Sequence, residues 1–483
     1  MRRRPSAQQC LSIAVSVVLS LGAWLFFWLL RPEWMSFQEQ NQLFLWTGDY
    51  LWQRLTVAGG LADWMGEFLV QFFRVEWLGA ALMGVLFVLM QQAGRKALAL
   101  TPRSSFLTHH SSLITHHSSL ITHHSSLLVH HSSLITHHFS LLVSILLPLF
   151  LLWLLGDENV LVALPVAVTL VLGAVALMRR TRRWWWLLIV PATAWAVGGP
   201  WTTYYRIPQH GPDLGGWNSE KWELLRQDYL IRNERWDELL QRAKEHEVKT
   251  PFWSNSVNLA LAMTGGLADH QFDYWQSGED ALLMTMMRDN VSNLPTMEAF
   301  WRLGMVNSAQ RYACDLQESI LNARKSGRLE QRIIECMLVN GHYELARKHL
   351  ALLKKSLFYR SWAEQTEQLL GNEAAIQAHP LYGQLRRLRY KENFLYNYTE
   401  IDKMLAILFQ GNKQNKMALE YFLGQLLLKG DAQTFVQALP WAQQHGGYQV
   451  MPMTYQDAVQ CIQSRQLPDT PYGQYVKRHF NEE

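Results

Sequence analysis

The sequence LSIAVSVVLSLGAWLFFWLL, residues 11–30, contains 20 consecutive uncharged residues, most of them apolar. At a helical rise of about 1.5 Å per residue this segment is about 30 Å long, which matches the hydrocarbon core of a bilayer. A cleaved signal peptide has a shorter apolar core, of about 7–15 residues, and ends at a small-x-small motif. Here the apolar run continues into FFWLLRP, residues 26–32. The pattern therefore predicts an uncleaved transmembrane helix.

Charged residues are distributed unevenly along the chain. Of the 483 residues, 17% are charged, against about 25% in an ordinary soluble domain. Residues 1–200 contain 13 Lys and Arg and 8 Asp and Glu, whereas residues 201–483 contain 31 and 32. The formal net charge of +4 does not indicate a nucleic-acid partner, because the excess basic residues are clustered beside apolar segments. The distribution predicts a membrane-embedded N-terminal domain, residues 1–200, followed by a water-exposed domain, residues 201–483.

Five apolar segments in the first domain are predicted to span the membrane, and they lie near residues 11–30, 75–91, 139–155, 160–178 and 184–200. Basic residues gather on the cytoplasmic side of short connections. A cytoplasmic N-terminus places all the strong basic clusters inside: Arg2–Arg4, then Arg95, Lys96 and Arg103, then Arg179, Arg180, Arg182 and Arg183. We therefore expect a multi-pass protein of the inner (cell) membrane, with the lipid bilayer as a partner. Residues 201–483 are then extracytoplasmic, in the periplasm if the cell is Gram-negative.

Five tandem heptads occupy residues 104–138, and they contain ten of the 18 histidines. Their typical sequence is SSLITHH. Paired histidines that recur every seven residues return to nearly the same helix face, where they could bind a metal ion. No carboxylate or thiolate accompanies them, and near-identical copies are typical of an expanded low-complexity segment. We favour a cytoplasmic low-complexity loop with no metal site.

The predicted external loop, residues 31–74, mixes aromatic and acidic residues. Apolar residues recur at helical spacing from Leu61 to Phe72, which predicts an amphipathic helix at the membrane interface. Membrane glycosyltransferases that use lipid-linked sugars commonly carry an acidic pair in such a loop, to bind a divalent metal or to act as a base. The candidate catalytic residues for that alternative are Glu39, Asp49, Asp63 and Glu67. We favour the other interpretation, in which Asp63 and Glu67 form the water-facing edge of the interfacial helix, because the loop has no adjacent acidic pair.

Residues 201–483 show helical periodicity and few strand signals. The predicted helices are separated by short turns, so consecutive helices are expected to be antiparallel neighbours. They include residues 218–232, 236–245, 253–263, 309–325, 329–339, 343–355, 416–428 and 433–444. The segment GHYELA, residues 341–346, followed by Leu350 and Leu353, is similar to the second helix of a tetratricopeptide unit, in which a small residue allows close helix contact. The predicted fold class is therefore all-α: a transmembrane helix bundle of about five spans, followed by an antiparallel, tetratricopeptide-like solenoid. An irregular helical bundle is the alternative for the second domain.

Signals of catalysis are scarce in the second domain. It has no G-x-S-x-G, P-loop or G-x-G-x-x-G motif. The four cysteines form no C-x-x-C motif, and we favour free, buried thiols for Cys314 and Cys336 over a disulfide between neighbouring helices. These observations predict neither a cofactor nor a metal site, and they favour a binding protein over an enzyme.

Two blocks of the first loop, MSFQEQNQLFLWTGDYL at residues 35–51 and GGLADWMGEFLVQFF at residues 59–73, resemble the opening of an uncharacterised family of multi-pass membrane proteins from Bacteroidetes. The segment MTYQDA, residues 453–458, also resembles a family block. The histidine repeat departs from the family pattern. The resemblance implies a membrane location and no established activity. The favoured function is a membrane-anchored scaffold whose external helical repeats recruit an envelope protein, and the transferase is the alternative.

Overall fold

The computed structural model describes residues 7–98, 141–199, 216–321, 324–392, 397–464 and 467–480. Within these ranges the chain forms helices, turns and loops and no strand, so the predicted all-α class is confirmed. The histidine repeat at residues 104–138 and the basic residues Arg2–Arg4 and Arg103 lie outside the described residues. The chain divides into two compact units. Unit 1 comprises Met1–Gln38 and Trp46–Asn218, and unit 2 comprises Glu39–Leu45 and Ser219–Glu483.

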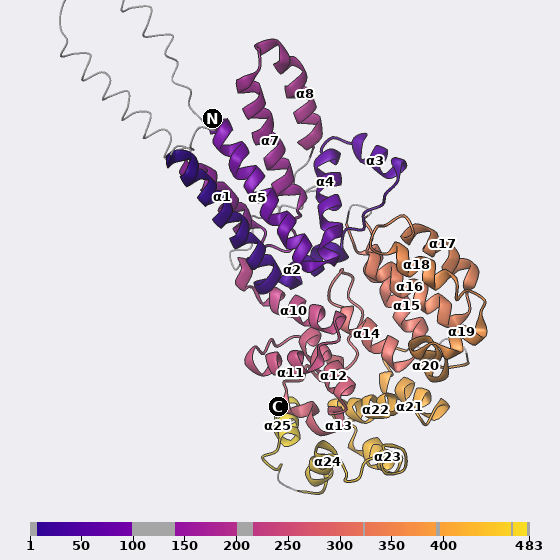
Figure 1. Ribbon diagram of the computed structural model, residues 1–483. Coiled ribbons are helices and arrows are strands. Elements are labelled where there is room, and N and C mark those ends of the chain that lie inside the picture. The colour runs from indigo at the N-terminus through magenta and orange to yellow at the C-terminus, as the bar shows by residue number, and fades with distance from the viewer. Residues whose placement is uncertain are drawn as a thin grey trace, which may run out of the picture. The chain divides into compact units, whose positions relative to one another are not determined.

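Unit 1 is built from long apolar helices and shorter connecting helices (Figure 1). Among the described residues, three stretches are long and apolar enough to cross a membrane, Cys10–Leu30, Glu76–Leu98 and Ala163–Arg180, while the apolar helix Leu141–Leu154 is shorter. The helices are α1 (Ala7–Leu25, continued by a π-helical turn at Phe26–Leu30), α2 (Pro32–Gln40, whose last two residues belong to unit 2), α3 (Gly48–Leu55), α4 (Gly60–Val70), α5 (Glu76–Leu98), the helix Leu141–Leu154, α7 (Ala163–Arg180) and α8 (Trp186–Val197).

Helices α1 and α5 pack together in opposite directions. In the middle of α1, Ser16 Oγ donates to Gln91 Oε1 in the second half of α5 at 2.9 Å. Near the end of α1, Trp24 Nε1 donates to the carbonyl oxygen of Trp77, at the start of α5, at 3.0 Å. Because the later residue of α1 pairs with the earlier residue of α5, these contacts establish an antiparallel helix pair.

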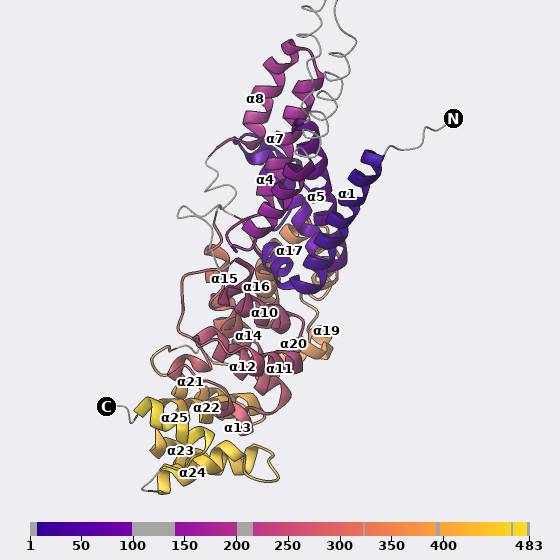
Figure 2. The same ribbon diagram turned by 90° about the vertical axis from the view of Figure 1, so that its left-hand side faces the viewer.

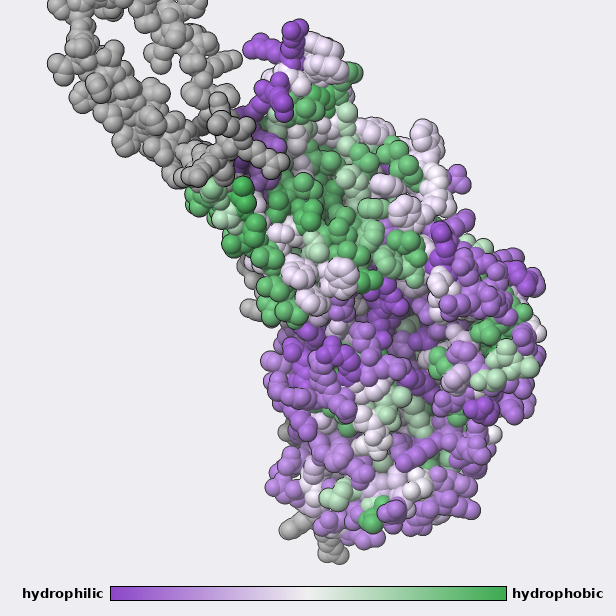
Figure 3. Space-filling view, in the orientation of Figure 1, coloured by the Kyte–Doolittle hydropathy of each residue, from purple (hydrophilic) through white to green (hydrophobic). Residues whose placement is uncertain are grey.

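The later apolar helices of unit 1 also change direction from one to the next. Gly94, near the end of α5, lies beside both Ser144, near the start of the helix Leu141–Leu154, and Leu172 in α7. At the turn between α7 and α8, Trp186 Nε1 donates to the carbonyl oxygen of Met178 at 2.8 Å. In Figures 1 and 2 the end of α5 and the turn between α7 and α8 lie toward the same end of unit 1. Figure 3 shows that the surface of these helices is largely hydrophobic.

Unit 2 is a set of short helices in which neighbours along the chain pack against each other, for example α14 with α15 and α16 with α17. Figure 2 gives a second view of them. The helices are α10 (Glu220–Arg232), α11 (Trp236–Glu245), α12 (Pro251–Thr264), α13 (Leu267–His270), α14 (Leu294–Leu303), α15 (Val306–Glu318), α16 (Gly327–Asn340), α17 (Tyr343–Leu353), α18 (Arg360–Glu367), α19 (Glu373–Ala378), α20 (Pro380–Leu388), α21 (Ile401–Gly411), α22 (Lys416–Lys429), α23 (Ala432–His445), α24 (Met453–Gln463) and α25 (Pro471–Phe480).

Four helix pairs among the described residues of unit 2 are joined by the same turn. The first helix is followed by Gly265, Gly304, Gly341 or Gly430, each with a φ angle between 75° and 83°, and the next helix begins two residues after the glycine. In each turn the amide after the glycine donates to the carbonyl five residues earlier, at 2.8, 2.9, 2.8 and 3.0 Å respectively. This Schellman geometry requires a left-handed residue, which glycine adopts without a Cβ clash. A repeated turn of this kind produces repeated antiparallel helix pairs.

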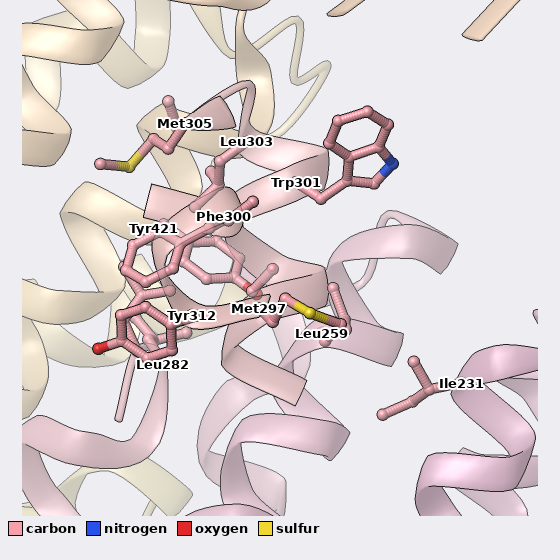
Figure 4. Packing of buried hydrophobic residues seen from close by; sticks show 14 of the residues in the cluster. Ile231, Leu259, Leu282, Met297, Phe300, Trp301, Leu303, Met305, Tyr312 and Tyr421 are labelled. Carbon is pink, nitrogen blue, oxygen red and sulfur yellow. The ribbon is translucent and has the colours of Figure 1, made fainter. Parts of the chain in front are cut away.

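The core of unit 2 combines aromatic and aliphatic side chains from several of these pairs. Phe300 of α14 and Tyr312 of α15 pack edge to face, with ring centroids 5.1 Å apart. Figure 4 shows them beside Tyr421 of α22, while Trp301 points away from this group. Ala346 of α17 is completely buried, as its proposed role in a close helix contact requires. Large buried side chains at fixed positions make unit 2 a packed domain that can hold a binding surface in shape.

The cysteines in unit 2 form no disulfide among the residues described here. Cys336 is buried and Cys314 is partly buried. The predicted burial is confirmed for Cys336 and only partly for Cys314.

Candidate functional site

Two of the four predicted acidic residues, Asp63 and Glu67, lie together on the inner side of α4. Both are 1% exposed. Arg54 of α3 donates from Nη2 to Glu67 Oε1 at 2.7 Å and from Nε to Glu67 Oε2 at 3.2 Å. Arg54 Nη1 lies 3.9 Å from Asp63 Oδ2, and the Tyr50 hydroxyl donates to Glu67 Oε2. The two carboxylates thus share one guanidinium, with a tyrosine completing the cluster.

The electrostatics of this cluster follow from burial and from the charge of Glu67. Burial raises the pKa of Tyr50, and the Glu67 carboxylate raises it further. Burial alone would lower the pKa of Arg54, but Glu67 raises it above its ordinary value. The guanidinium therefore stays charged and compensates the buried carboxylate. Such a cluster holds α3 against α4 through charge-assisted hydrogen bonds.

The prediction that Asp63 and Glu67 face water from the edge of α4 is wrong. The helix packs against α7, and Gly66 lies so close to Ala163 that a Cβ atom would overlap it. The face of α4 that carries the two acids is therefore turned into the protein, and the apolar residues Trp64 and Phe68 are only partly buried. Sequence periodicity groups residues on a face, but it does not tell whether water or another helix covers that face.

The other two predicted acidic residues lie elsewhere. Asp49 is exposed in the first turn of α3. Glu39 belongs to unit 2, is 4% exposed, and accepts hydrogen bonds from Arg232 Nη2 at 2.7 Å and from the Tyr359 hydroxyl at 2.6 Å. The structure therefore brings together only Asp63 and Glu67 of the four candidates.

Glu39 begins a segment, Glu39–Leu45, that is built into unit 2. Gln40 Oε1 accepts from Arg328 Nη1 at 2.7 Å, Asn41 Oδ1 accepts from Asn290 Nδ2 at 2.7 Å, and the amide of Leu43 donates to the carbonyl of Lys325 at 2.7 Å. Leu43 also joins the hydrophobic core of the unit. A polar segment from the first loop is thus an integral part of the folded second unit.

A network of buried charges lies on α10, α14 and α16. Arg328 Nη1 lies 2.7 Å from Asp228 Oδ2, and Arg328 Nη2 lies 3.4 Å from Glu298 Oε1. Arg332 donates to both oxygens of Glu298, at 3.1 and 2.9 Å. Burial alone would raise the pKa of Glu298, but Arg332 and then Arg328 lower it to about 2. Both carboxylates of the network are paired with arginines, and only Arg332 Nε has no hydrogen-bond partner among the described residues, which is typical of a structural role.

No group of three or more His, Cys, Asp or Glu side chains with metal-binding spacing occurs among the described residues. Activity as a lipid-linked sugar transferase stays a prediction. The carboxylates of Asp63 and Glu67 already pair with Arg54, and no other observation favours this activity.

A cleft in unit 2 is the best candidate binding site. It has a volume of about 310 Å³ and is formed by α12, α14, α20 and α22. Asn415 Nδ2 donates to the carbonyl of Leu303 at 2.9 Å, and Asn415 Oδ1 caps α22 at the amide of Ala418, so the start of α22 is held against the end of α14. The lining residues are Ala262, Met263, Trp301, Arg302, Leu381, Gln384, Leu385, Leu388, Gln414, Asn415, Lys416 and Met417.

The lining of the cleft is apolar with a basic and amide rim, and it contains no acidic residue. Arg302 Nη2 donates to Glu234 Oε1 at 2.6 Å, while its Nε atom is buried without a hydrogen-bond partner in the described structure. Lys416 Nζ lies 3.5 Å from Glu420 Oε1 and is half exposed. Leu381 is 36% exposed. The cleft thus offers aliphatic contact surface, a cation and hydrogen-bonding amides to a ligand.

Sequence reasoning predicted that the helical repeats of unit 2 bind another protein, but it did not identify these residues. They come from four helices spread over residues 262–417, and no local motif links them. Their only sequence signal is the position of the left-handed glycines, which mark where helix pairs turn. The cleft itself depends on how separate pairs pack, which spacing along the chain does not encode.

The comparisons with known proteins identify a family but no activity. The model for a family of unknown function, DUF6057, matches residues 7–207 and 200–482, so the chain belongs to this family. This confirms the predicted membership of an uncharacterised family. No curated protein matches the chain. No solved structure matches it.

Proposed function

We propose that this member of the DUF6057 family is a membrane-anchored scaffold whose second unit binds a segment of another envelope protein in the cleft described above. The observation that carries the proposal is the cleft itself, an apolar groove of about 310 Å³ with basic and amide groups at its edge. Helical repeats commonly bind peptides or proteins along such surfaces.

The membrane anchor is supported by the three long apolar helices. The apolar helix Leu141–Leu154 and α8 are shorter, but they continue the alternation of direction within unit 1. We therefore propose five crossings, with the N-terminus in the cytoplasm and unit 2 outside it. The large exposed apolar side chains on α1, α5 and α8 support a lipid environment for these helices.

The repeat character of unit 2 is supported by its recurring turn. The glycine turns at residues 304, 341 and 430 each join a pair of helices with the same hydrogen bond across the turn. Stacked pairs of this kind are typical of tetratricopeptide-like solenoids.

The chemistry of the cleft favours a peptide with aliphatic side chains and at least one carboxylate. Aliphatic groups fit against Leu381, Leu388 and Met417, and a carboxylate complements the half-exposed Lys416 side chain. The amides of Gln384 and Gln414 are suited to hydrogen bonds with a peptide backbone.

In-cell photo-crosslinking tests the proposal. A photoreactive amino acid placed at Gln384 or Gln414, inside the cleft, is expected to capture the same partner protein. The same amino acid at Gln437, exposed on α23 outside the cleft lining, is expected to capture nothing. Capture at all three positions, or at none, would refute the cleft as the binding site.

A matched pair of leucine variants makes the test specific. Leu381→Glu places a carboxylate at the cleft edge and is expected to abolish crosslinking from Gln414. Leu345→Glu makes the same change at a 48% exposed leucine of α17 and is expected to leave crosslinking unchanged. Topology is tested separately with alkaline phosphatase fused after Trp201, which is expected to be active. An inactive fusion, with a fluorescent cytoplasmic reporter at the same site, would refute the five-crossing topology.

A further inference from the structure

Acidic and basic residues are segregated along unit 1. Residues 77–156 and 159–212 contain no Asp or Glu. The second stretch contains a set of basic residues at the end of α7 and in the turn that leads to α8, which we call the basic tip: Arg179, Arg180, Arg182 and Arg183. Since these four lie within five consecutive residues, they form one positively charged region.

The basic tip is open to its surroundings. Arg179, Arg180, Arg182 and Arg183 are all exposed. Three tryptophans follow directly, with exposed fractions of 54%, 43% and 42% at residues 184, 185 and 186. Figure 3 shows hydrophilic residues at this end of the hairpin of α7 and α8, with a hydrophobic surface beginning next to them.

The tryptophans are held in place by local contacts. The rings of Trp184 and Trp185 stack with centroids 4.2 Å apart. Trp186 Nε1 donates to the carbonyl of Met178 at 2.8 Å, which satisfies its polar group while its ring faces outward. The next residues, Leu187 and Leu188, are 78% and 58% exposed. Along the chain, cationic side chains are therefore followed by indole rings and then by aliphatic side chains. These three groups match the headgroup layer, the interface and the hydrocarbon core of a bilayer, in that order.

We propose that the basic tip is a binding surface for the headgroups of anionic phospholipids. The guanidinium groups match the phosphate oxygens of a lipid headgroup in bidentate geometry, and the indoles lie at the level of the interface. A nucleic acid would meet the same cations, but it would leave the adjacent aliphatic and indole surface in water. The inference rests on the membrane location proposed above, and it adds a lipid preference that membrane insertion alone does not require.

Native mass spectrometry of the full chain released from detergent micelles tests the inference, with phosphatidylglycerol or phosphatidylcholine as the added lipid. We expect phosphatidylglycerol to be retained at least tenfold more strongly than phosphatidylcholine. The triple variant Arg180→Gln, Arg182→Gln, Arg183→Gln is expected to lose this preference. The matched triple variant Arg347→Gln, Arg360→Gln, Arg387→Gln removes three exposed arginines of unit 2 and is expected to keep it.

Two results would overturn the inference. One is equal retention of the two lipids by the unaltered chain, and the other is loss of the preference in the unit 2 variant as well. A triple Arg→Lys variant at residues 180, 182 and 183 keeps the charge and is expected to retain most of the preference, which separates loss of charge from misfolding. Extraction of cell membranes with alkaline carbonate distinguishes the two proposals. A chain released by carbonate refutes the membrane anchor, whereas a chain that stays in the membrane but does not prefer phosphatidylglycerol refutes only the lipid site.

Discussion

Replacing Arg328 with methionine is expected to destabilise unit 2 by about 3–5 kcal/mol, because it leaves the buried Asp228 carboxylate without its cation. The Arg328 and Asp228 side chains are 8% and 7% exposed, and Arg328 Nη1 approaches the two carboxylate oxygens to 3.0 and 2.7 Å. The same nitrogen donates to Gln40 at 2.7 Å. Solvent therefore cannot replace the lost partner. Against a typical total stability of about 5–15 kcal/mol this loss is large.

The assay is urea unfolding of the full chain in detergent, followed by pulse proteolysis and detection of a C-terminal tag. Arg347→Met is the matched control, since Arg347 is half exposed and pairs with the exposed Glu344. The control is expected to change stability by no more than about 0.5 kcal/mol. The double variant Arg328→Met, Asp228→Asn is expected to be more stable than the sum of the single changes predicts, because it removes both charges. If Arg328→Met unfolds at the same urea concentration as Arg347→Met, the buried network does not stabilise unit 2 and the reasoning is wrong.

Three further predictions follow from buried positions. The pKa of Glu298 is lowered to about 2 by its arginine neighbours, so unit 2 is expected to lose roughly 3 kcal/mol of stability as the pH falls from about 4.5 to about 2. Urea midpoints across that range should show the loss, and Glu298→Gln should remove that part of the pH dependence. Ala346→Arg forces a guanidinium into a fully buried position between α16 and α17 and is expected to cost several kcal/mol, whereas Lys348→Arg on the exposed face of α17 should leave the urea midpoint unchanged. Glu67→Gln removes the main partner of Arg54 and is expected to destabilise the chain by about 1–3 kcal/mol, measurable as a lower melting temperature in detergent, while Asp49→Asn at an exposed site should be silent.

The sequence alone predicted eight of the sixteen helices that unit 2 has among the described residues, because the start and stop signals of those eight are local. The predicted helix at residues 236–245 coincides with α11. The predicted helix at residues 416–428 ends one residue before α22 does, and the predicted helix at residues 433–444 is one residue shorter than α23 at both ends. Left-handed glycines such as Gly430 end these helices through a turn that needs no distant residue. The predicted helix at residues 309–325 is too long, since α15 ends at Glu318 and a separate helix begins at Gly327, capped by Ser326.

The surroundings of the candidate site residues depend on contacts between residues that are distant in the sequence. The periodicity of apolar residues along the chain does not reveal such contacts. Glu39 lies within the first loop in sequence, but its partners Arg232 and Tyr359 follow it by 193 and 320 residues. The environment of Glu67 is set by Arg54 on another helix and by the packing of α4 on α7. Helix type and membrane-spanning potential are properties of a few neighbouring residues, so they can be predicted from one stretch of sequence. Burial, ion pairing and the shape of the cleft arise only when separate helices pack, and therefore only the tertiary structure decided them.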